Sequence, residues 1–390
     1  MKLSHGLHLA YCTNIHRGET WAETLDALQR YTLAVRDRVA SGAAYAIGLR
    51  LSDQASRELS DPAALKEFRR WLDEHNCYVF TINGFPYGKF HGVRVKEQVY
   101  APDWTTRERL EFTNRLFDIL AELLPDGVEG SVSTVPCSFK EFIHADDQVK
   151  AMRDNLWQCV DHIACLSERA GKMLHLGLEP EPLCYLETSA ETVLFFQQLR
   201  ADRAFDERLS RHLGVNYDTC HLAVEFEEPA HALAQFRQNN IRISKIHLSS
   251  ALKVRPTAET RAALASFADD VYFHQVIERR LDGTLRRYRD LDVALAKSML
   301  EEPLPEWRIH FHIPLHSEPT PLFQNTSDHI LGVLQALHEF PDLCHHLEME
   351  TYTWEVIPEP MKSRSVVDQL TSEYQWTLDK LGRHGFERSG

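Results

Sequence analysis

Residues 174–181 read LHLGLEPE, and residues 213–221 read LGVNYDTCH. In each stretch a short, largely apolar run leads to a carboxylate, Glu179 in the first and Asp218 in the second. Helical periodicity separates the two runs, and a strand, a helix and a strand in this order are typical of a βαβ unit. Strands of such a unit are covered on both faces, which explains their apolar character. The sequence therefore predicts a parallel sheet whose strands end on ionisable groups.

The same alternation of short β-rich runs and amphipathic helices continues along the chain. Successive strand starts lie about 30–50 residues apart, except for one interval of 66 residues. This recurrence favours an α/β fold of the (β/α)8 TIM barrel type over a doubly wound sheet, since the sequence contains no GxGxxG or P-loop motif. Nine segments qualify as strands, one more than a barrel needs, so either a late segment or the first one lies outside it. The candidates are Leu7–Cys12, Ala46–Leu51, Tyr78–Ile82, Gly130–Val135, Leu174–Leu178, Leu213–Tyr217, Ile243–Leu248, Ile309–Ile313 and Leu347–Thr351.

The long interval carries an insertion. Asp282-Gly283 is a hairpin-turn signal, and it predicts paired strands at Tyr272–Arg280 and Thr284–Arg289, followed by a helix at Leu291–Leu300. Because no linker rich in Gly, Pro or Ser divides the chain, we expect residues 1–390 to form one barrel domain with an extra strand and long βα-loop insertions.

Composition excludes several classes of protein. The 390 residues include 43 Lys and Arg against 57 Asp and Glu, a formal charge of −14, which gives no broad attraction to nucleic acid or to an anionic membrane. No run of about 18 apolar residues is present to insert into a bilayer. We therefore expect a soluble, cytoplasmic protein that acts on a small molecule, with no nucleic-acid partner. Its oligomeric state stays open, a homo-oligomer included.

Ionisable residues recur at the predicted strand ends. In a parallel barrel these ends meet at one face, so their side chains are expected to gather there. Taken singly, a histidine such as His310 can be a hydrogen-bonded core residue, and a glutamate can cap the next helix. Several ionisable side chains buried together would cost free energy unless a cation pairs with them, and this favours a divalent metal site. The series is Glu179, Asp218 with His221, His247, His310 with His312, and Glu350.

The strand periodicity of two refines this choice. Glu348 and Glu350 share a face, and Glu350 lies nearer the carboxyl end of its strand, so Glu350 is the better ligand. Glu179 ends its strand, whereas Glu181 lies beyond Pro180 and is better placed to contact substrate.

A loop rich in aromatic residues and glycine follows the third predicted strand. Such a loop at the mouth of a barrel can stack on a polyol and hydrogen-bond its hydroxyl groups, although a rigid, self-packed loop is an equal reading. Residues 11–16, at the first strand end, can also contribute. The candidate binding residues here are Asn83, Phe85, Tyr87, His91, Lys96 and Trp104.

The strand-end series resembles the xylose isomerase-like superfamily of TIM barrels, particularly its sugar and ketose epimerases. Longer segments resemble the metabolite traffic proteins of the EboE type over nearly the whole chain. That narrower resemblance implies a TIM barrel and an association with metabolite biosynthesis or export, but no reaction. The segments are Tyr11–His16, Thr81–Gly88, Phe90–Gly92, Val99–Tyr100 with Pro102–Trp104, and Leu347–Trp354.

The resemblance to the epimerases implies site roles. It implies a metal ion held by Glu179, Asp218, His247 and Glu350, with the two glutamates serving as acid and base on opposite faces of the substrate. It also places His221 near the substrate. The chain departs from the epimerases in the strand that carries His310, His312 and His316; we group His312 and Glu181 with the candidate substrate-binding residues.

These observations lead to three functional hypotheses. The first is a metal-dependent isomerase or epimerase of a sugar- or cyclitol-like polyol, working through an enediolate with Mn²⁺, Co²⁺, Mg²⁺ or Zn²⁺. The second is a metal-containing metabolite-binding or carrier protein without turnover, since fold does not imply chemistry. The third is a metal-dependent hydrolase of a small substrate.

Overall fold

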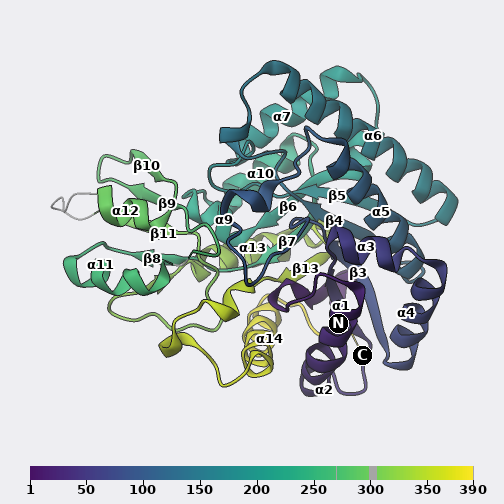
Figure 1. Ribbon diagram of the computed structural model, residues 1–390, viewed down its shortest axis with the longest axis horizontal. Helices are drawn as coiled ribbons and strands as arrows, with labels where there is room; N and C mark the ends of the chain where they lie inside the picture. The colour runs from purple at the N-terminus through teal and green to yellow at the C-terminus, as the bar shows by residue number, and fades with distance from the viewer. Residues whose placement is uncertain (269, 298–304, 390) are drawn as a thin grey trace.

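The computed structural model describes residues 1–268, 270–297 and 305–389. Eight parallel strands form one sheet in the order β1-β13-β7-β6-β5-β4-β3-β2 (Figure 1). A bridge between Cys12 and Gly48 links the two outer strands of this sheet. The predicted (β/α)8 barrel is thereby confirmed. The barrel strands are β1 (His8–Tyr11), β2 (Tyr45–Arg50), β3 (Cys77–Asn83), β4 (Gly130–Thr134), β5 (Leu174–Leu178), β6 (Leu213–Asp218), β7 (Arg242–Leu248) and β13 (His346–Met349).

The surplus strand candidate is Ile309–Ile313. The chain forms a strand just before it, β11 (Glu306–Ile309), which pairs antiparallel with two strands outside the barrel. The placement of Ile309–Ile313 as a strand is therefore wrong beyond Ile309, and the first strand candidate belongs to the barrel. The sequence pattern could not exclude this segment from the barrel, because a short apolar run has the same pattern in a barrel strand as in a strand of a separate sheet.

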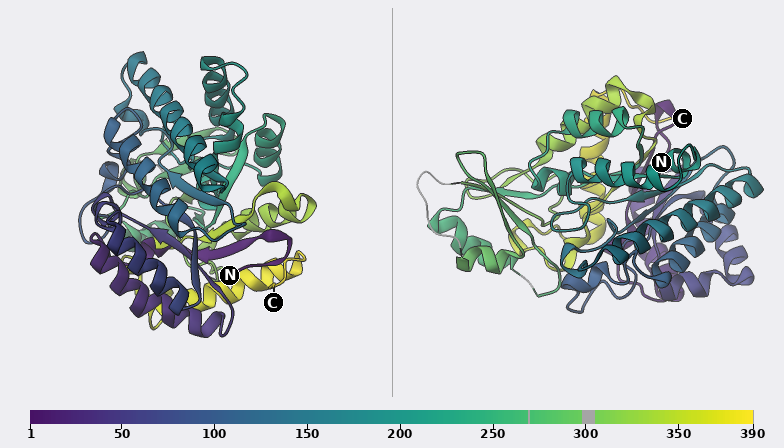
Figure 2. Two further views of the ribbon diagram at one scale, coloured as in Figure 1. Left: turned by 90° about the vertical axis from the view of Figure 1, so that its right-hand side faces the viewer. Right: turned by 90° about the horizontal axis from the view of Figure 1, so that it is seen from above.

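Helices cover the outside of the barrel and lie between successive strands (Figure 2). Their starts follow the expected chemistry: the side chain of Asp61 accepts hydrogen bonds from the backbone N–H groups of Ala63 and Ala64. The helices are α1 (Trp21–Ala27), α2 (Leu33–Val39), α3 (Asp53–Leu59), α4 (Pro62–Glu74), α5 (Arg107–Leu123), α6 (Asp146–Ala170), α7 (Ser189–Asp202), α8 (Arg208–His212), α9 (Thr219–Val224), α10 (Pro229–Gln238), α13 (Ser327–Glu339) and α14 (Val366–Arg383).

The insertion between β7 and α13 forms a second, antiparallel sheet that projects from one side of the barrel (Figures 1 and 2). Its strand order is β10-β9-β11-β8-β12, and it has a core of its own that includes Leu252, Val276 and Trp307. The predicted hairpin is present as β9 and β10. Its elements are β8 (Leu252–Val254), α11 (Ala258–Leu264), β9 (Val276–Arg279), β10 (Leu285–Tyr288), α12 (Leu291–Lys297), β11 and β12 (Gln324–Asn325). The last three residues of the predicted helix Leu291–Leu300 lie outside the described residues.

A glycine makes room for charge inside the barrel. A Cβ atom at Gly48 would lie 2.0 Å from Oε1 of Glu348, so only glycine leaves space for that carboxylate. Glu348 Oε2 accepts a hydrogen bond from the Lys245 ammonium at 2.6 Å, and both side chains are almost fully buried. The barrel interior therefore holds a compensated ion pair directly beneath the face where the predicted site residues meet.

Among the described residues, no helix combines the length and the apolar character needed to cross a membrane.

Candidate metal centre

Four of the predicted ligands converge at the carboxyl ends of β5, β6, β7 and β13. Glu179, Asp218, His247 and Glu350 each offer one ligand atom, and these four atoms lie within 4.8 Å of one another. Nδ1 of His247 is at the centre, 2.9 Å from Glu179 Oε1, 3.2 Å from Glu350 Oε2 and 3.5 Å from Asp218 Oδ2. All four side chains are buried. The barrel thus brings together the set that the resemblance implied.

Glu348 decides the tautomer of His247. Nε2 of His247 lies 2.8 Å from Glu348 Oε2, and Lys245 holds that carboxylate ionised against the effect of burial, so the pKa of Glu348 falls to about 2. Because an ionised carboxylate only accepts, Nε2 carries the proton and donates it. With Nε2 held in this way, Nδ1 is the nitrogen that faces the three carboxylates, and it can coordinate a cation bound among them once its own proton is released.

The charges around His247 also favour a bound cation. Burial lowers the pKa of His247, but the neighbouring charges of Glu350 and Glu179 outweigh burial and raise it well above its ordinary value. Two buried carboxylate oxygens, Glu179 Oε2 and Asp218 Oδ2, have no hydrogen-bond partner among the described residues. Orphaned buried oxygens are rare unless an ion or water completes them, so the donor set fits a divalent metal.

Local structure positions two of the carboxylates. Asp218 caps the N-terminus of α9: its Oδ1 accepts hydrogen bonds from the His221 backbone N–H at 2.9 Å and from Ser249 Oγ at 2.7 Å. Glu350 Oε1 accepts from the side-chain amides of Asn14 at 2.7 Å and Asn83 at 3.1 Å. These bonds leave one oxygen of each carboxylate directed toward His247.

A cavity opens beside the four ligands. Its floor includes Glu179, Glu350, Glu181, His221 and His310, whereas its walls are largely aromatic. Such a combination suits a small ligand with polar groups at one end or along one edge. The aromatic wall residues are Phe85, Phe90, Tyr100, Tyr272, Phe273 and Tyr352.

Several candidate binding residues lie at this cavity. Phe85, Lys96, Glu181 and His221 line it, and the Lys96 ammonium pairs with Asp290 at 2.6 Å. Burial, only partly offset by His221, raises the pKa of Glu181 to about 7. Tyr100 donates a hydrogen bond to Glu181 Oε1 at 2.6 Å. Glu181 is therefore expected to exchange a proton near neutral pH.

The remaining candidates lie around the cavity or away from it. Asn83 supports Glu350, and His312 is fully buried with its Nδ1 3.0 Å from the Glu350 carbonyl oxygen. His91 bridges the Asn14 carbonyl oxygen and the Tyr272 hydroxyl. Tyr87 packs against Phe112, and Trp104 is buried with its Nε1 donating to Thr134 Oγ1; neither is among the described residues that line the cavity.

Sequence reasoning did not single out the residues that the insertion contributes. Tyr272 and Phe273 precede β9 and reach the cavity wall, and Gln275 contacts His310. Only the dense aromatic and polar run from Val271 to Gln275 signalled them, and nothing in the sequence places that run beside the barrel mouth. Lys245 and Glu348 were visible at strand ends, but their pairing depends on the closure of the barrel.

Solved structures with a similar fold span nearly the whole chain. An L-ribulose 3-epimerase is 12% identical with a TM-score of 0.52, over 99% of this chain and 96% of the other. A xylose isomerase-like TIM barrel protein from Mycobacterium smegmatis, in complex with magnesium, is 15% identical with a TM-score of 0.52, over 98% and 99% of the two chains. An IOLI protein with a bound zinc atom is 13% identical with a TM-score of 0.50, over 96% and 98%.

Comparison by sequence alone finds no match. No protein-family model and no curated protein matches the chain, so the EboE-type resemblance stays a prediction based on the motifs quoted above. At 12 to 15% identity the structural similarities show the fold alone. Taken with the closed sheet of eight parallel strands, they show that this chain has the fold of the xylose isomerase-like TIM barrels.

Proposed function

We propose that the protein is a metal-dependent isomerase or epimerase of a sugar- or cyclitol-like polyol. The observation that carries the proposal is the cluster of Glu179, Asp218, His247 and Glu350, in which Nδ1 of His247 faces three carboxylates. Similar folds that are named as an L-ribulose 3-epimerase and a D-tagatose 3-epimerase-like protein support the substrate class.

The cluster has the groups that proton transfer next to a carbonyl requires. Glu179, Asp218, His247 and Glu350 would hold the ion, which supplies positive charge that acidifies the adjacent C–H bond when bound. One of the two glutamates, Glu179 or Glu350, removes the proton to give an enediolate, and the other returns a proton to the opposite face. Asn14 and Asn83 hold Glu350 in place, and aromatic side chains line the adjoining cavity in which the substrate would bind.

The mixed oxygen and nitrogen donors fit Mn²⁺, Co²⁺, Mg²⁺ or Zn²⁺. Three carboxylates and one imidazole are harder than the ligand sets of thiolate sites, so we rank Mn²⁺ and Mg²⁺ first for this position.

Exchange of hydrogen from solvent tests the proposal. The metal-loaded protein is incubated in D2O with a set of ketopentoses, ketohexoses and inosose-type cyclitols, and deuterium incorporation is followed by NMR. We expect incorporation at the carbon next to the carbonyl group of one substrate class. Glu179→Gln and Glu350→Gln should each reduce the rate by at least about 100-fold, because each removes an acid–base group.

The exposed Glu141→Gln serves as the matched control and should exchange at the wild-type rate. A protein that binds both metal and a polyol tightly but exchanges no C–H hydrogen would be a carrier, and the catalytic proposal would then be wrong.

A further inference from the structure

The cavity beside the candidate metal centre is covered by protein. Every residue that lines it is buried except Val99, which is partly buried. The insertion contributes Tyr272, Phe273 and His310 to this lining, and none of the three is more than 8% exposed. Because side chains so well covered leave a polyol no open path to the metal ligands, part of the surrounding protein has to move before a ligand of this size enters.

The insertion is joined to the barrel through a narrow neck. The chain leaves the barrel after Ser250 and returns to it at Thr326, and hydrogen bonds link the two crossings. Ser250 Oγ accepts from the Thr326 backbone N–H at 3.2 Å, and Thr326 Oγ1 accepts from the Ala251 backbone N–H at 2.9 Å. The Ile313 backbone N–H donates to the Ser250 carbonyl oxygen at 2.9 Å, so a third crossing lies at the same place. Beyond the neck the second sheet packs on a core of its own, and a body attached in this way can turn about its neck as a unit.

At the cavity, polar contacts hold the insertion against the loop that follows β3. The Lys96 ammonium pairs with Asp290 Oδ2 at 2.6 Å, and the Tyr272 hydroxyl lies 2.6 Å from Nδ1 of His91. The Val271 carbonyl oxygen accepts from the Lys96 backbone N–H at 3.1 Å. Water can replace each of these bonds, so they open at lower cost than an extended apolar interface. The backbone of Lys96 is in the left-handed region, with a φ of 40°, so the closed loop holds strain that opening can release.

The insertion also carries polar groups that meet the barrel only in the closed arrangement. Nδ1 of His310 lies 2.7 Å from Gln275 Oε1, and the Gln275 amide nitrogen donates to the Tyr100 hydroxyl at 3.0 Å and to the Pro182 carbonyl oxygen at 3.3 Å. Nε2 of His310 is 3.1 Å from Nε2 of His221. Closure therefore fixes the ring of His310 against a barrel residue that lines the cavity.

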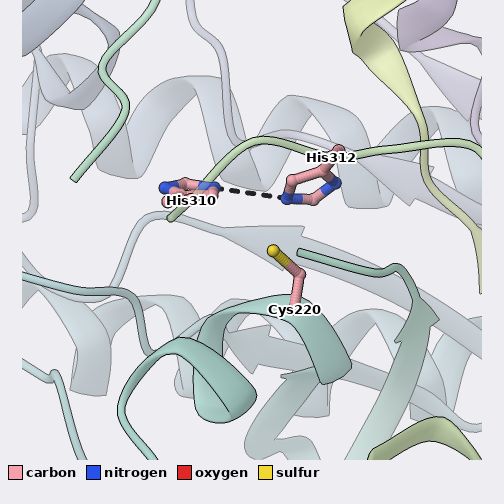
Figure 3. A group of neighbouring side chains, drawn as sticks. All are labelled: Cys220, His310 and His312. Carbon is pink, nitrogen blue, oxygen red and sulfur yellow. Dashed lines mark hydrogen bonds between the residues drawn. The ribbon is translucent and has the colours of Figure 1, made fainter. Parts of the chain in front are cut away.

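A buried thiol lies beneath the insertion. Figure 3 shows His310 and His312, which follow β11 on one segment, above Cys220 of α9. Ala251 and Ile277 of the insertion belong to the same small apolar cluster as Cys220. Cys220 is 0% exposed, so a reagent reaches its Sγ when the insertion separates from α9 or when the whole chain unfolds.

We propose that the insertion is a hinged cover of the cavity. It turns about the neck at Ser250 and Thr326 to admit a small molecule, and its closure brings Tyr272, Phe273 and His310 against that molecule. A site that only binds its ligand needs this step as much as a site that turns the ligand over. The proposal therefore stands apart from the proposed function.

Alkylation of cysteine under native conditions tests the hinge. The full chain, with no metal or ligand added, is treated with N-ethylmaleimide for increasing times, and the labelled peptides are quantified by mass spectrometry. Each rate is divided by the rate of the same thiol in the urea-unfolded chain. Cys159 of α6, which is also 0% exposed, is the internal reference for unfolding of the barrel. We expect Cys220 to be labelled at least about tenfold faster than Cys159, because opening of the cover costs less than global unfolding.

Two variants weaken the contact between the cover and the β3 loop. Asp290→Asn removes the charge that pairs with Lys96 but keeps an oxygen to accept from the backbone N–H groups of His274 and Leu291. Lys96→Met removes the ammonium from the barrel side of the same pair. Each variant leaves one buried charge without its partner in the closed state, so the labelling rate of Cys220 should rise by at least about fivefold.

Glu259→Gln changes an exposed carboxylate of α11 in the same insertion and should be labelled at the wild-type rate. The rate of Cys159 should be the same in all four proteins, and urea unfolding checks that the barrel keeps its stability. Equal normalised rates at Cys220 and Cys159 in the wild type would overturn the proposal, because the insertion would then open only when the barrel unfolds. A Cys220 rate that neither Asp290→Asn nor Lys96→Met changes would overturn it as well. Since the measurement uses neither metal nor substrate, its outcome does not depend on the proposed function.

Discussion

At the scale of single residues, the site depends on which nitrogen of each histidine carries its proton. Glu348 accepts a hydrogen bond from Nε2 of His247, which directs Nδ1 at the three carboxylates, and backbone carbonyl oxygens accept from Nδ1 of His221 and His312. Glu348 itself stays ionised because Lys245 pairs with it inside the barrel. The orientation of His247 at the candidate metal centre is therefore set by residues outside the four-ligand cluster.

This arrangement predicts a coupled effect at Lys245. Lys245→Met leaves Glu348 buried without its ammonium partner, so the free energy of unfolding should fall by roughly 3–5 kcal/mol. Urea unfolding at pH 7 measures the change. The double variant Lys245→Met/Glu348→Gln removes both charges and should recover most of the loss. A double variant no more stable than Lys245→Met would show that the pair does not act as a unit.

At the scale of elements, a buried carboxylate on α14 makes stability depend on pH. Glu373 is fully buried on this helix, and burial raises its pKa to about 8 from an ordinary value of 4.5. Between these two values the native protein keeps a proton that the unfolded chain has released. This group therefore contributes stability that is complete below pH 4.5 and is lost as the pH rises toward 8.

Glu373→Gln should remove that dependence. Near pH 4.5 the variant and the wild type should have the same Tm. As the pH rises to about 8 the variant should become progressively more stable than the wild type, by at most about 5 kcal/mol in the free energy of unfolding. Thermal unfolding in a pH series measures the difference. Asp379→Asn, on the solvent side of the same helix, should show no such divergence between pH 5 and 8. A difference in Tm between Glu373→Gln and the wild type that stays constant across the pH series would contradict the assignment of this pH dependence to Glu373.

At the scale of the whole molecule, the second sheet completes the site that the barrel begins. It brings Tyr272 and Phe273 to the cavity wall and leads directly into His310 and His312. Arg287 of β10 links this sheet to the barrel loops through Glu187, at 2.7 Å, and through Glu225. Glu225 is fully buried within this link.

Arg287→Met should therefore loosen the sheet from the barrel. Loss of a charged hydrogen-bonding partner costs about 1–3 kcal/mol, so amide hydrogen exchange in β9 and β10 should accelerate roughly tenfold or more. Mass spectrometry of peptides from residues 276–288 measures it. Arg286→Met, on the same strand with 44% of its side chain exposed, is the control and should exchange near the wild-type rate. Equal exchange in both variants would argue against the link.

The sequence alone determined the barrel and the position of the four candidate metal ligands at its strand ends. Strand recurrence and a periodicity of two are local properties, so they located Glu179, Asp218, His247 and Glu350 at strand ends without knowledge of the rest of the fold. The same periodicity favoured Glu350 over Glu348 as a ligand, and in the structure Glu348 pairs with Lys245.

Only the tertiary structure decided the rest. It placed Ile309 in the second sheet, brought His310 and His312 against His221, and set the proton of each histidine through acceptors far away in sequence. It also left Tyr87 and Trp104 away from the cavity, packed around neighbouring helices and strands. These outcomes depend on which distant segments meet, and contacts of that kind leave no periodic signal in a single sequence.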